Sequence, residues 1–318
     1  MSTPTVDIGI PVYGRAEYVV QAIESVAGQS YPHWRLTISE DAGPTEPILR
    51  AVEPYLADQR IRYAGAGAHL GTARSKSLLV AQGDGAYAAV LDDDDCWLED
   101  WLLRRVEFLE THPECVLVWA GHFDIDADGN RLTRSPFPFA GGVHSSESFV
   151  RTMMRANVVT TPSVLVRRDA YRRAGMTFDP AFVHIHDYEM WLRLGLLGPV
   201  GFLEVHDCCY RVHARQMSRR DDRAVDHLRL IDHLDALLRD SRPELRLPPD
   251  ARRRQKADRM LSAALDAAEA GQRRIAARRI ASAIRLAPPK LCSRRALGAI
   301  AATVGGDAIR RRISARRS

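Results

Sequence analysis

Strand-like and helix-like segments alternate through the N-terminal third of the chain, and this alternation restricts the fold more than any other feature. Four segments rich in β-branched or aromatic residues are predicted strands: 6–13, 34–39, 60–63 and 86–91. Three intervening segments carry apolar residues at helical spacing and are predicted helices: 17–27, 48–56 and 71–81. The pattern therefore predicts an α/β fold with a mostly parallel central sheet flanked by helices.

Four consecutive aspartates, residues 92–95, follow the last of these strands and precede a predicted helix over 96–109. Glu40 and Asp41 end another strand, so both acidic groups are expected at the same carboxyl edge of the sheet. Crowded carboxylates repel one another unless a cation neutralises them, and their oxygen atoms suit Mg²⁺ or Mn²⁺. The alternative is a solvated acidic turn whose last aspartate caps the helix.

Charge is distributed unevenly along the 318 residues, whose formal net charge is +5. Residues 251–318 contain 18 basic and 4 acidic side chains, whereas the rest of the chain is acidic and has no nucleic-acid-binding motif. No nucleic-acid partner is therefore expected. The sequence shows no signal peptide, no transmembrane stretch and no zinc-type cysteine spacing, which together predict a cytoplasmic protein.

Two segments in the second half carry further candidate residues. A helix pattern near residues 186–194 places His186 and Asp187 at its start, where a carboxylate is also an ordinary cap. The alternation of residues in the extended segment 210–213 places Arg211 and His213 on the same side. Such a pair of side chains suits binding of a diphosphate and its metal, and the alternative is an exposed basic strand end. The chain lacks both the dinucleotide GxGxxG motif and a P-loop.

Four segments together resemble family 2 glycosyltransferases, the inverting nucleotide-sugar enzymes of the GT-A fold. They occur in the family's order across residues 5–220: 10–41 (IPVYGRAEYV…TISED), 69–97 (HLGTARSKS…LDDDDCW), 178–195 (FDPAFVHIHDYEMWLRLG) and 210–218 (YRVHARQMS). The resemblance implies a Rossmann-like GT-A catalytic domain over 1–220. Its nucleotide-sugar half would cover about 1–125 and its acceptor half about 126–220, followed by a basic helical region over 221–318.

The resemblance implies roles for residues on the donor side. Pro11 and Tyr13 match positions that hold the nucleotide base, and Glu40 and Asp41 match the acidic pair that reads base and ribose. Arg74 matches a basic residue near the nucleotide.

The same resemblance implies the reaction centre. Asp92 and Asp93 match the donor-binding part of the DxD region, with Asp93 toward the ribose, and Asp94 matches the direct metal ligand. Asp187 matches the general base. Arg211 and His213 match a segment that closes over the diphosphate, with His213 as a second metal ligand.

The implied function is metal-dependent, inverting transfer of a sugar from a UDP-, dTDP- or GDP-linked donor to a hydroxyl of a glycan, lipid-linked or small-molecule acceptor. Mn²⁺ or Mg²⁺ is the expected cofactor, and bacterial glycan, glycolipid or glycoconjugate synthesis the expected setting. The alternatives are a non-catalytic scaffold of the same fold that binds a nucleotide sugar or glycan, and nucleotidyl transfer, which the missing phosphate loop disfavours.

The sequence departs from the family pattern at His69, Ser75, Ala42 and His186, positions that bear on nucleotide and sugar preference. His186 either tunes the neighbouring base or contacts the acceptor, or else it faces solvent beside the helix cap.

The C-terminal region contains a predicted helical hairpin, 263–270 and 275–286, separated by Gly271. A basic amphipathic segment follows at 291–318. This region is expected either to contact the inner face of a membrane peripherally or to form an oligomer interface, or else to be a soluble helical cap.

Overall fold

The computed structural model describes residues 3–65, 67–213, 216 and 223–287. Backbone contacts divide the chain into two compact units, residues 1–216 and 217–318. In the described part of the chain no helix is both long enough and apolar enough to cross a membrane. The predicted segment 291–318 lies outside the described residues.

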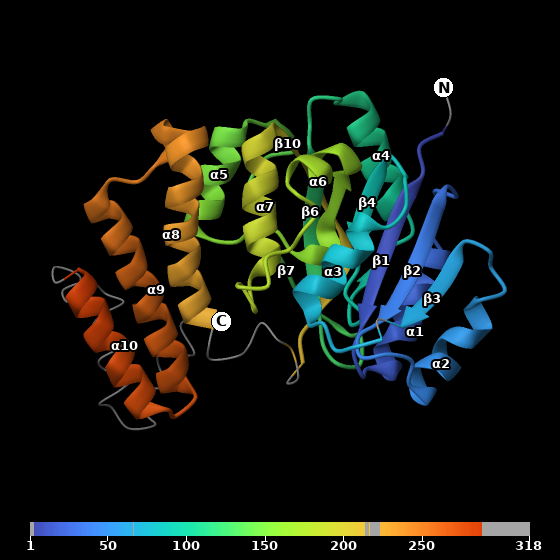
Figure 1. Ribbon diagram of the computed structural model, residues 1–318, viewed down its shortest axis with the longest axis horizontal. Coiled ribbons are helices and arrows are strands. Elements are labelled where there is room, and N and C mark those ends of the chain that lie inside the picture. The colour runs from blue at the N-terminus through green and yellow to red at the C-terminus, as the bar shows by residue number, and fades with distance from the viewer. Residues whose placement is uncertain (1–2, 66, 214–215, 217–222, 288–318) are drawn as a thin grey trace. The chain divides into compact units, whose positions relative to one another are not determined.

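The first unit alternates strands and helices before it becomes more irregular (Figure 1). Its first half contains β1 (Val6–Val12), α1 (Ala16–Ala27), β2 (Trp34–Glu40), α2 (Glu46–Val52), β3 (Ile61–Gly65), α3 (Thr72–Ala81), β4 (Tyr87–Val90), β5 (Cys96–Trp97) and α4 (Trp101–Thr111). Its second half contains β6 (Leu117–Ile125), β7 (Arg131–Arg134), β8 (Gly142–His144), α5 (Ser146–Arg155), β9 (Val164–Arg167), α6 (Arg168–Arg173), α7 (His186–Leu197) and β10 (Val200–Arg211).

One sheet joins these strands, and its main path runs in the order β3-β2-β1-β4-β9-β6-β10-β5, with β7 paired to β6 and β8 to β10 beside this path. The pairings β3–β2, β2–β1 and β1–β4 are all parallel, as the alternation with helices predicts. β9 then lies antiparallel between β4 and β6, and β10 runs parallel to β6. The α/β class with flanking helices is therefore confirmed. The prediction of a mostly parallel sheet holds only for its first half, because the hairpins and crossovers of the second half add antiparallel pairings and make the sheet mixed.

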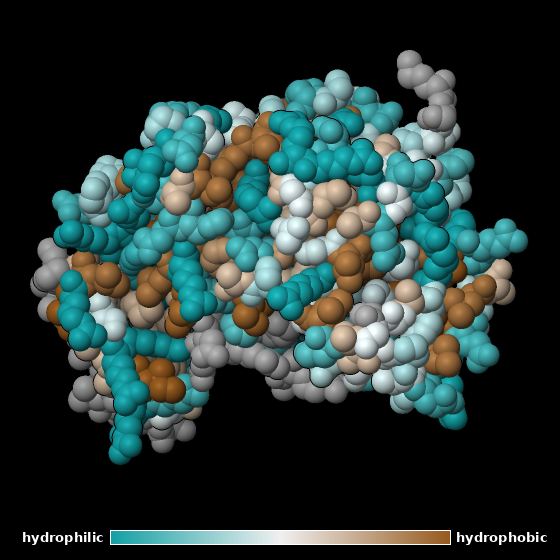
Figure 2. All heavy atoms as spheres, in the orientation of Figure 1, coloured by the Kyte–Doolittle hydropathy of each residue, from teal (hydrophilic) through white to brown (hydrophobic). Residues whose placement is uncertain are grey.

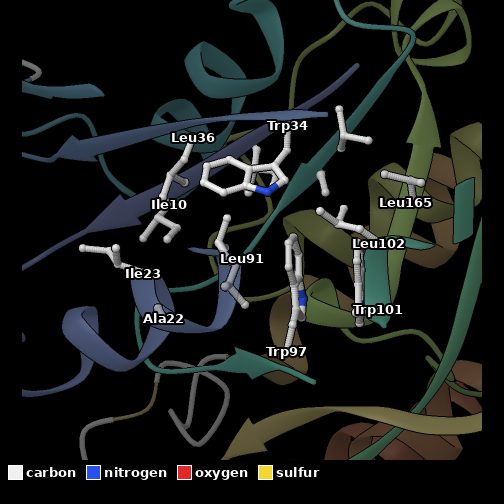
Figure 3. Packing of buried hydrophobic residues seen from close by; sticks show 14 of the residues in the cluster. Ile10, Ala22, Ile23, Trp34, Leu36, Leu91, Trp97, Trp101, Leu102 and Leu165 are labelled. Atoms are coloured by element: carbon white, nitrogen blue, oxygen red, sulfur yellow. The ribbon is translucent and has the colours of Figure 1, made fainter. Parts of the chain in front are cut away.

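Alternate residues of β1 face opposite sides of the sheet. Val6, Ile8, Ile10 and Val12 join the main hydrophobic core with residues of α1 and α4. Figure 3 shows Ile10 with Ala22 and Ile23 of α1 and with Trp34, Leu36, Trp97 and Trp101.

Gly9 faces the opposite side, where α3 packs. A β-carbon at this position would lie 2.6 Å from Cβ of Leu79, so the glycine permits the close approach of α3. At its other end α3 reaches the carboxyl edge of the sheet, where the N–H of Gly71, the residue before the helix, donates to Asp41 after β2.

The predicted helix after the aspartates begins later than expected. Cys96 and Trp97 form the short strand β5, which pairs antiparallel with Cys209 and Cys208 of β10, and α4 starts only at Trp101. The Trp97 and Trp101 rings stack with centroids 3.8 Å apart. Sheet pairing thus overrides the helical spacing of this segment.

The second unit is helical in its described part: α8 (Arg223–Ser241), α9 (Pro249–Glu269) and α10 (Arg273–Leu286). The predicted hairpin is present, with a first helix longer than expected and a turn at Gly271 whose φ is +80°. Small residues such as Ala264, Ala268 and Ala276 form its core. Hydrophilic and apolar side chains are interspersed over the visible face of this unit (Figure 2).

Candidate active site

The four aspartates lie just beyond the end of β4, at the edge where β1 and β2 also end. Asp93, Asp94 and Asp95 are buried, so the alternative of a solvated acidic turn is wrong. The N-cap residue of α4 is Asp100 and not Asp95. Buried carboxylates require compensating partners, and the structure supplies them.

Basic side chains from distant segments form ion pairs with three of the four aspartates. Lys76 of α3 lies 2.8 Å from Asp92, measured between Nζ and Oδ1. Arg15, in the turn after β1, forms ion pairs with both Asp93 and Asp94, the latter at 2.7 Å. These contacts offset the mutual repulsion of the acids.

Burial changes the protonation of the aspartate cluster. It raises the pKa of Asp93 to about 7, with Arg15 opposing the rise and Asp94 adding to it. Burial, reinforced by the charges of Asp94 and Asp92, also raises the pKa of Asp95. One buried oxygen of Asp95, Oδ2, has no hydrogen-bond partner in the described part of the chain.

Asp94 and His213 form the candidate metal pair. The His213 Nε2 and Asp94 Oδ2 atoms are 3.0 Å apart, and His213 is buried. This separation is close to that of adjacent ligands around an octahedral ion, roughly 3 Å for bonds of about 2.1 Å. The described residues contain no group of three His, Cys, Asp or Glu side chains placed to hold a metal. The same two atoms also lie at hydrogen-bonding distance, and Arg15 pairs with Asp94 Oδ2 at 2.7 Å, so a bound ion would have to replace these contacts. With only two protein ligands, such an ion would take the rest from substrate phosphates and water, and the metal role of the pair stays a prediction.

The predicted nucleotide-binding residues around β2 and α3 lie at this same edge. The Asp41 carboxylate accepts the backbone N–H groups of Leu70 (2.5 Å) and Gly71 (2.9 Å) and lies 3.0 Å from Nδ1 of His69. The His69 ring lies 5.0 Å from that of Tyr13, which is 59% exposed. Asp41 thus shapes the loop before α3, and Tyr13 presents a ring for stacking.

The other predicted donor residues differ in exposure. Pro11 lies within β1, and Arg74 is exposed on α3. Glu40 is buried, and its carboxylate accepts hydrogen bonds from the Thr45 N–H (3.0 Å), the Thr45 hydroxyl (2.6 Å) and the Tyr63 hydroxyl. The roles of all three in nucleotide binding stay predictions.

Arg211 is fully buried, so the alternative of an exposed basic strand end is wrong. Its backbone N–H donates to Asp95 Oδ1 (2.8 Å), and its Nε donates to the backbone carbonyl of Asp94 (2.7 Å). The remaining guanidinium nitrogens donate to the carbonyls of Asp126 and Ala127 and to Gln21. The guanidinium therefore holds the aspartate segment in place, and its predicted contact with a diphosphate stays a prediction.

Asp187 lies in the first turn of α7, as the sequence predicts. Its Oδ1 accepts the backbone N–H of Tyr188 at 2.7 Å, and its Oδ2 lies 3.4 Å from the Thr161 hydroxyl. The ammonium group of Lys76 lies 3.3 Å from that same hydroxyl. Since Lys76 also contacts Asp92, two side chains link Asp187 to the aspartates.

His186 is buried, so the solvent-facing alternative is wrong. Burial and the nearby Lys76 ammonium group lower the pKa of its imidazole.

The pKa of Lys76 shifts in the opposite direction. Burial alone would lower the pKa of its ammonium group, but the carboxylates of Asp92 and Asp187 raise it above the ordinary value. Lys76 therefore remains a buried cation.

Arg15, Lys76 and Thr161 are site residues that the sequence analysis did not identify. A signal existed for Lys76, which shares a helix face with Ala73 and Val80, so a lysine stands at a buried position of α3. A buried lysine requires an acidic partner. Thr161 and Arg15 carry no comparable local signal.

The candidate site thus combines buried acids and an exposed ring at the carboxyl edge of the parallel half of the sheet with a separate carboxylate on α7. The model of the family described as "Glycosyl transferase family 2" matches residues 7–174. The chain therefore belongs to glycosyl transferase family 2, and its enzyme class is that of the glycosyltransferases.

Relatives and solved structures agree with this assignment. The putative teichuronic acid biosynthesis glycosyltransferase TuaG of Bacillus subtilis is 26% identical over 194 residues, which cover 60% of this chain and 72% of TuaG. The putative colanic acid biosynthesis glycosyl transferase WcaA of Escherichia coli is 25% identical over 198 residues, covering 61% and 67%. An uncharacterized protein of Sinorhizobium fredii is matched over only 14% of its own length.

Similarity in fold extends further than similarity in sequence. The structure of S. aureus TarS 1-349 in complex with UDP-GlcNAc has a TM-score of 0.66 at 15% identity, covering 98% of this chain and 91% of that one. The mannosyltransferase PcManGT of Pyrobaculum calidifontis, in complex with GDP-Man and Mn²⁺, has a TM-score of 0.57 at 15% identity, covering 100% and 80%.

Proposed function

We propose that this protein is a metal-dependent, inverting glycosyltransferase that moves a sugar from a nucleoside diphosphate to an acceptor hydroxyl. The observation that carries the proposal is the set of contacts through Lys76 and Thr161, which brings the aspartates and Asp187 into one site. Such a site has the two parts that the reaction needs, a place for a charged leaving group and a separate base.

The donor is assigned to the edge formed by β1, β2 and the aspartate segment. Tyr13, beside Pro11, presents a ring to the nucleotide base, while Glu40 and Asp41 shape the pocket for base and ribose. Arg74 reaches the nucleotide from α3, and Asp92 and Asp93 bind the ribose and sugar. Arg211 positions the aspartate segment.

Asp94 and His213 are the residues that would hold Mn²⁺ or Mg²⁺. The ion, when bound, would neutralise negative charge on the departing diphosphate. Asp187 accepts the proton of the acceptor hydroxyl while the oxygen of that hydroxyl bonds to the anomeric carbon. The bond from that carbon to the diphosphate breaks in the same displacement, so the anomeric centre is inverted.

The substrates are proposed as classes. Solved neighbours hold UDP-GlcNAc and GDP-Man, which supports a UDP-, dTDP- or GDP-linked donor. The names of TuaG and WcaA support a role in making a bacterial surface glycan, with a glycan, lipid-linked or small-molecule acceptor. The compact unit 1–216 supports a catalytic domain over about 1–220. The division of this domain into a nucleotide-sugar half and an acceptor half stays a prediction. So do a cytoplasmic location and a role of the C-terminal helices in membrane contact or oligomer formation.

Donor turnover tests the proposal. Purified protein is incubated with Mn²⁺ and either UDP-GlcNAc or GDP-mannose, and release of the nucleoside diphosphate is measured with and without candidate acceptors. Asp187→Asn should lower turnover by about 10²–10⁴-fold and leave nucleotide binding intact. Asp169→Asn, on the exposed surface of α6, is the matched control. If Asp187→Asn leaves turnover unchanged, the assignment of Asp187 as the base is wrong. If the wild-type protein binds the nucleotide but shows no turnover, the non-catalytic scaffold is favoured.

A further inference from the structure

A buried lysine and a buried threonine connect the donor side of the site with the base. The Lys76 side chain is 3% exposed, and its Nζ lies 2.8 Å from Asp92 Oδ1 and 3.3 Å from the Thr161 hydroxyl oxygen. That hydroxyl in turn lies 3.4 Å from Asp187 Oδ2. The three segments involved are α3, the turn before β9 and the start of α7.

The direction of these hydrogen bonds follows from the donor inventory. A lysine ammonium group only donates, so the Thr161 oxygen accepts from Lys76. The single hydroxyl proton of Thr161 is then free to point to Asp187, whose carboxylate accepts. Because the proton donor to the carboxylate is itself polarised by a cation, the bond to Asp187 is strengthened.

Hydrogen bonds from three side chains anchor the turn that carries Thr161. The Ser163 hydroxyl donates to the Thr160 carbonyl (2.8 Å), and the buried Arg105 donates through Nε to the Ser163 carbonyl (3.0 Å). The indole N–H of Trp97 donates to the Pro162 carbonyl (2.7 Å). Proline at position 162 further restricts the backbone. Such support is typical of a group whose orientation matters.

We propose that Thr161 and Lys76 are positioning residues for Asp187: Lys76 orients the Thr161 hydroxyl, and Thr161 fixes the carboxylate for proton transfer. The inference rests on the proposed function, in which Asp187 is the base. Lys76 binds Asp92 as well, so the same ammonium group ties the donor-binding loop to the base. Neither side chain needs to touch the reacting atoms.

Substitutions at Thr161 provide the test, with Thr160 as the matched control. The Thr160 hydroxyl contacts His122 (3.4 Å) and not Asp187. With UDP-GlcNAc or GDP-mannose, whichever the wild-type protein turns over, Thr161→Val should lower kcat roughly 10- to 100-fold. The donor KM should stay within about twofold, because Thr161 orients the base and not the donor. Thr161→Ser should restore most of kcat, and Thr160→Val should resemble the wild type.

A double-mutant cycle tests the part played by Lys76. If Lys76 acts through Thr161, Lys76→Gln should lower kcat less in the Thr161→Val background than in the wild type. Losses that multiply independently would remove Lys76 from the proposal. Equal kcat values for Thr161→Val and Thr160→Val, or a rise in KM alone, would overturn the role of Thr161.

Asp187→Asn in the same assay separates the two claims. Full turnover by Asp187→Asn would refute the proposed base itself. An inactive Asp187→Asn together with a fully active Thr161→Val would refute only the positioning role. Thermal melting of each variant shows whether a lost activity reflects a lost fold, and Thr161→Ser, the mildest change, remains informative if Lys76→Gln does not fold.

Discussion

Arg211→Met removes a buried guanidinium and tests whether this residue supports the fold or serves the substrate. Four hydrogen bonds are lost, to the carbonyls of Asp94, Asp126 and Ala127 and to the side chain of Gln21. Methionine fills much of the volume but leaves these acceptors without their donors, and buried unsatisfied acceptors are costly.

The expected loss in the free energy of unfolding is about 3–5 kcal/mol, because each buried acceptor left without a donor costs about 1–3 kcal/mol and local relaxation recovers part of the sum. This loss corresponds to a fall in melting temperature of roughly 10 °C for a unit of this size. Arg62→Met, on the exposed face of β3, is the matched control and should change stability by less than about 0.5 kcal/mol.

Urea denaturation, monitored by tryptophan fluorescence, measures the loss in the free energy of unfolding. The signal reports on the first unit, because all five tryptophans lie within residues 1–216. A loss below about 1 kcal/mol, accompanied by weaker binding of a nucleoside diphosphate, would refute the reasoning. In that case the guanidinium would act on the diphosphate, as the family resemblance implies.

Two further predictions concern packing and protonation. Gly201→Ala should lower stability by about 1–3 kcal/mol in a melting experiment, because a β-carbon there would lie 2.1 Å from the Phe108 ring. Gly141→Ala is the control and should be nearly neutral, since its β-carbon would have its nearest contact at 3.5 Å. Equal effects of the two substitutions would contradict the packing. Burial and Lys76 lower the pKa of His186 in the folded state, so the unfolded chain takes up a proton first as pH falls below 6.5, and stability is lost in that range. His186→Gln should remove this part of the pH dependence of melting, whereas parallel curves for both proteins would contradict it.

Local patterns were sufficient to predict the first half of the sheet and the places of several site residues. The strands before Asp41 and Asp92 and the helix that starts near Asp187 each follow from the periodicity of a short segment. Parallel pairing then brings the acids after β2 and β4 to one edge. The sequence analysis could thus predict where the site lies.

Long-range contacts could not be predicted in this way. Arg15 and Asp94 are 79 residues apart in the sequence, and Lys76 and Thr161 are 85 apart. Arg15 meets Asp94 because β1 pairs with β4, which is not its neighbour in the sequence. The contact between Lys76 and Thr161 depends on how β9 inserts antiparallel between β4 and β6, and no local pattern specifies that order. For the same reason, the periodicity of Cys96 and Trp97 predicted a helix where pairing with β10 forms a strand.

The most direct test of the central claim is calorimetric titration with UDP, dTDP and GDP, each in the presence of Mn²⁺ and then of EDTA. A metal-dependent donor site predicts that one nucleotide binds with Mn²⁺, that EDTA weakens its binding, and that Asp94→Asn removes the difference between the two conditions. Binding that is equally strong in EDTA, or the absence of binding by all three nucleotides, would contradict the assignment of Asp94 and His213 to the metal.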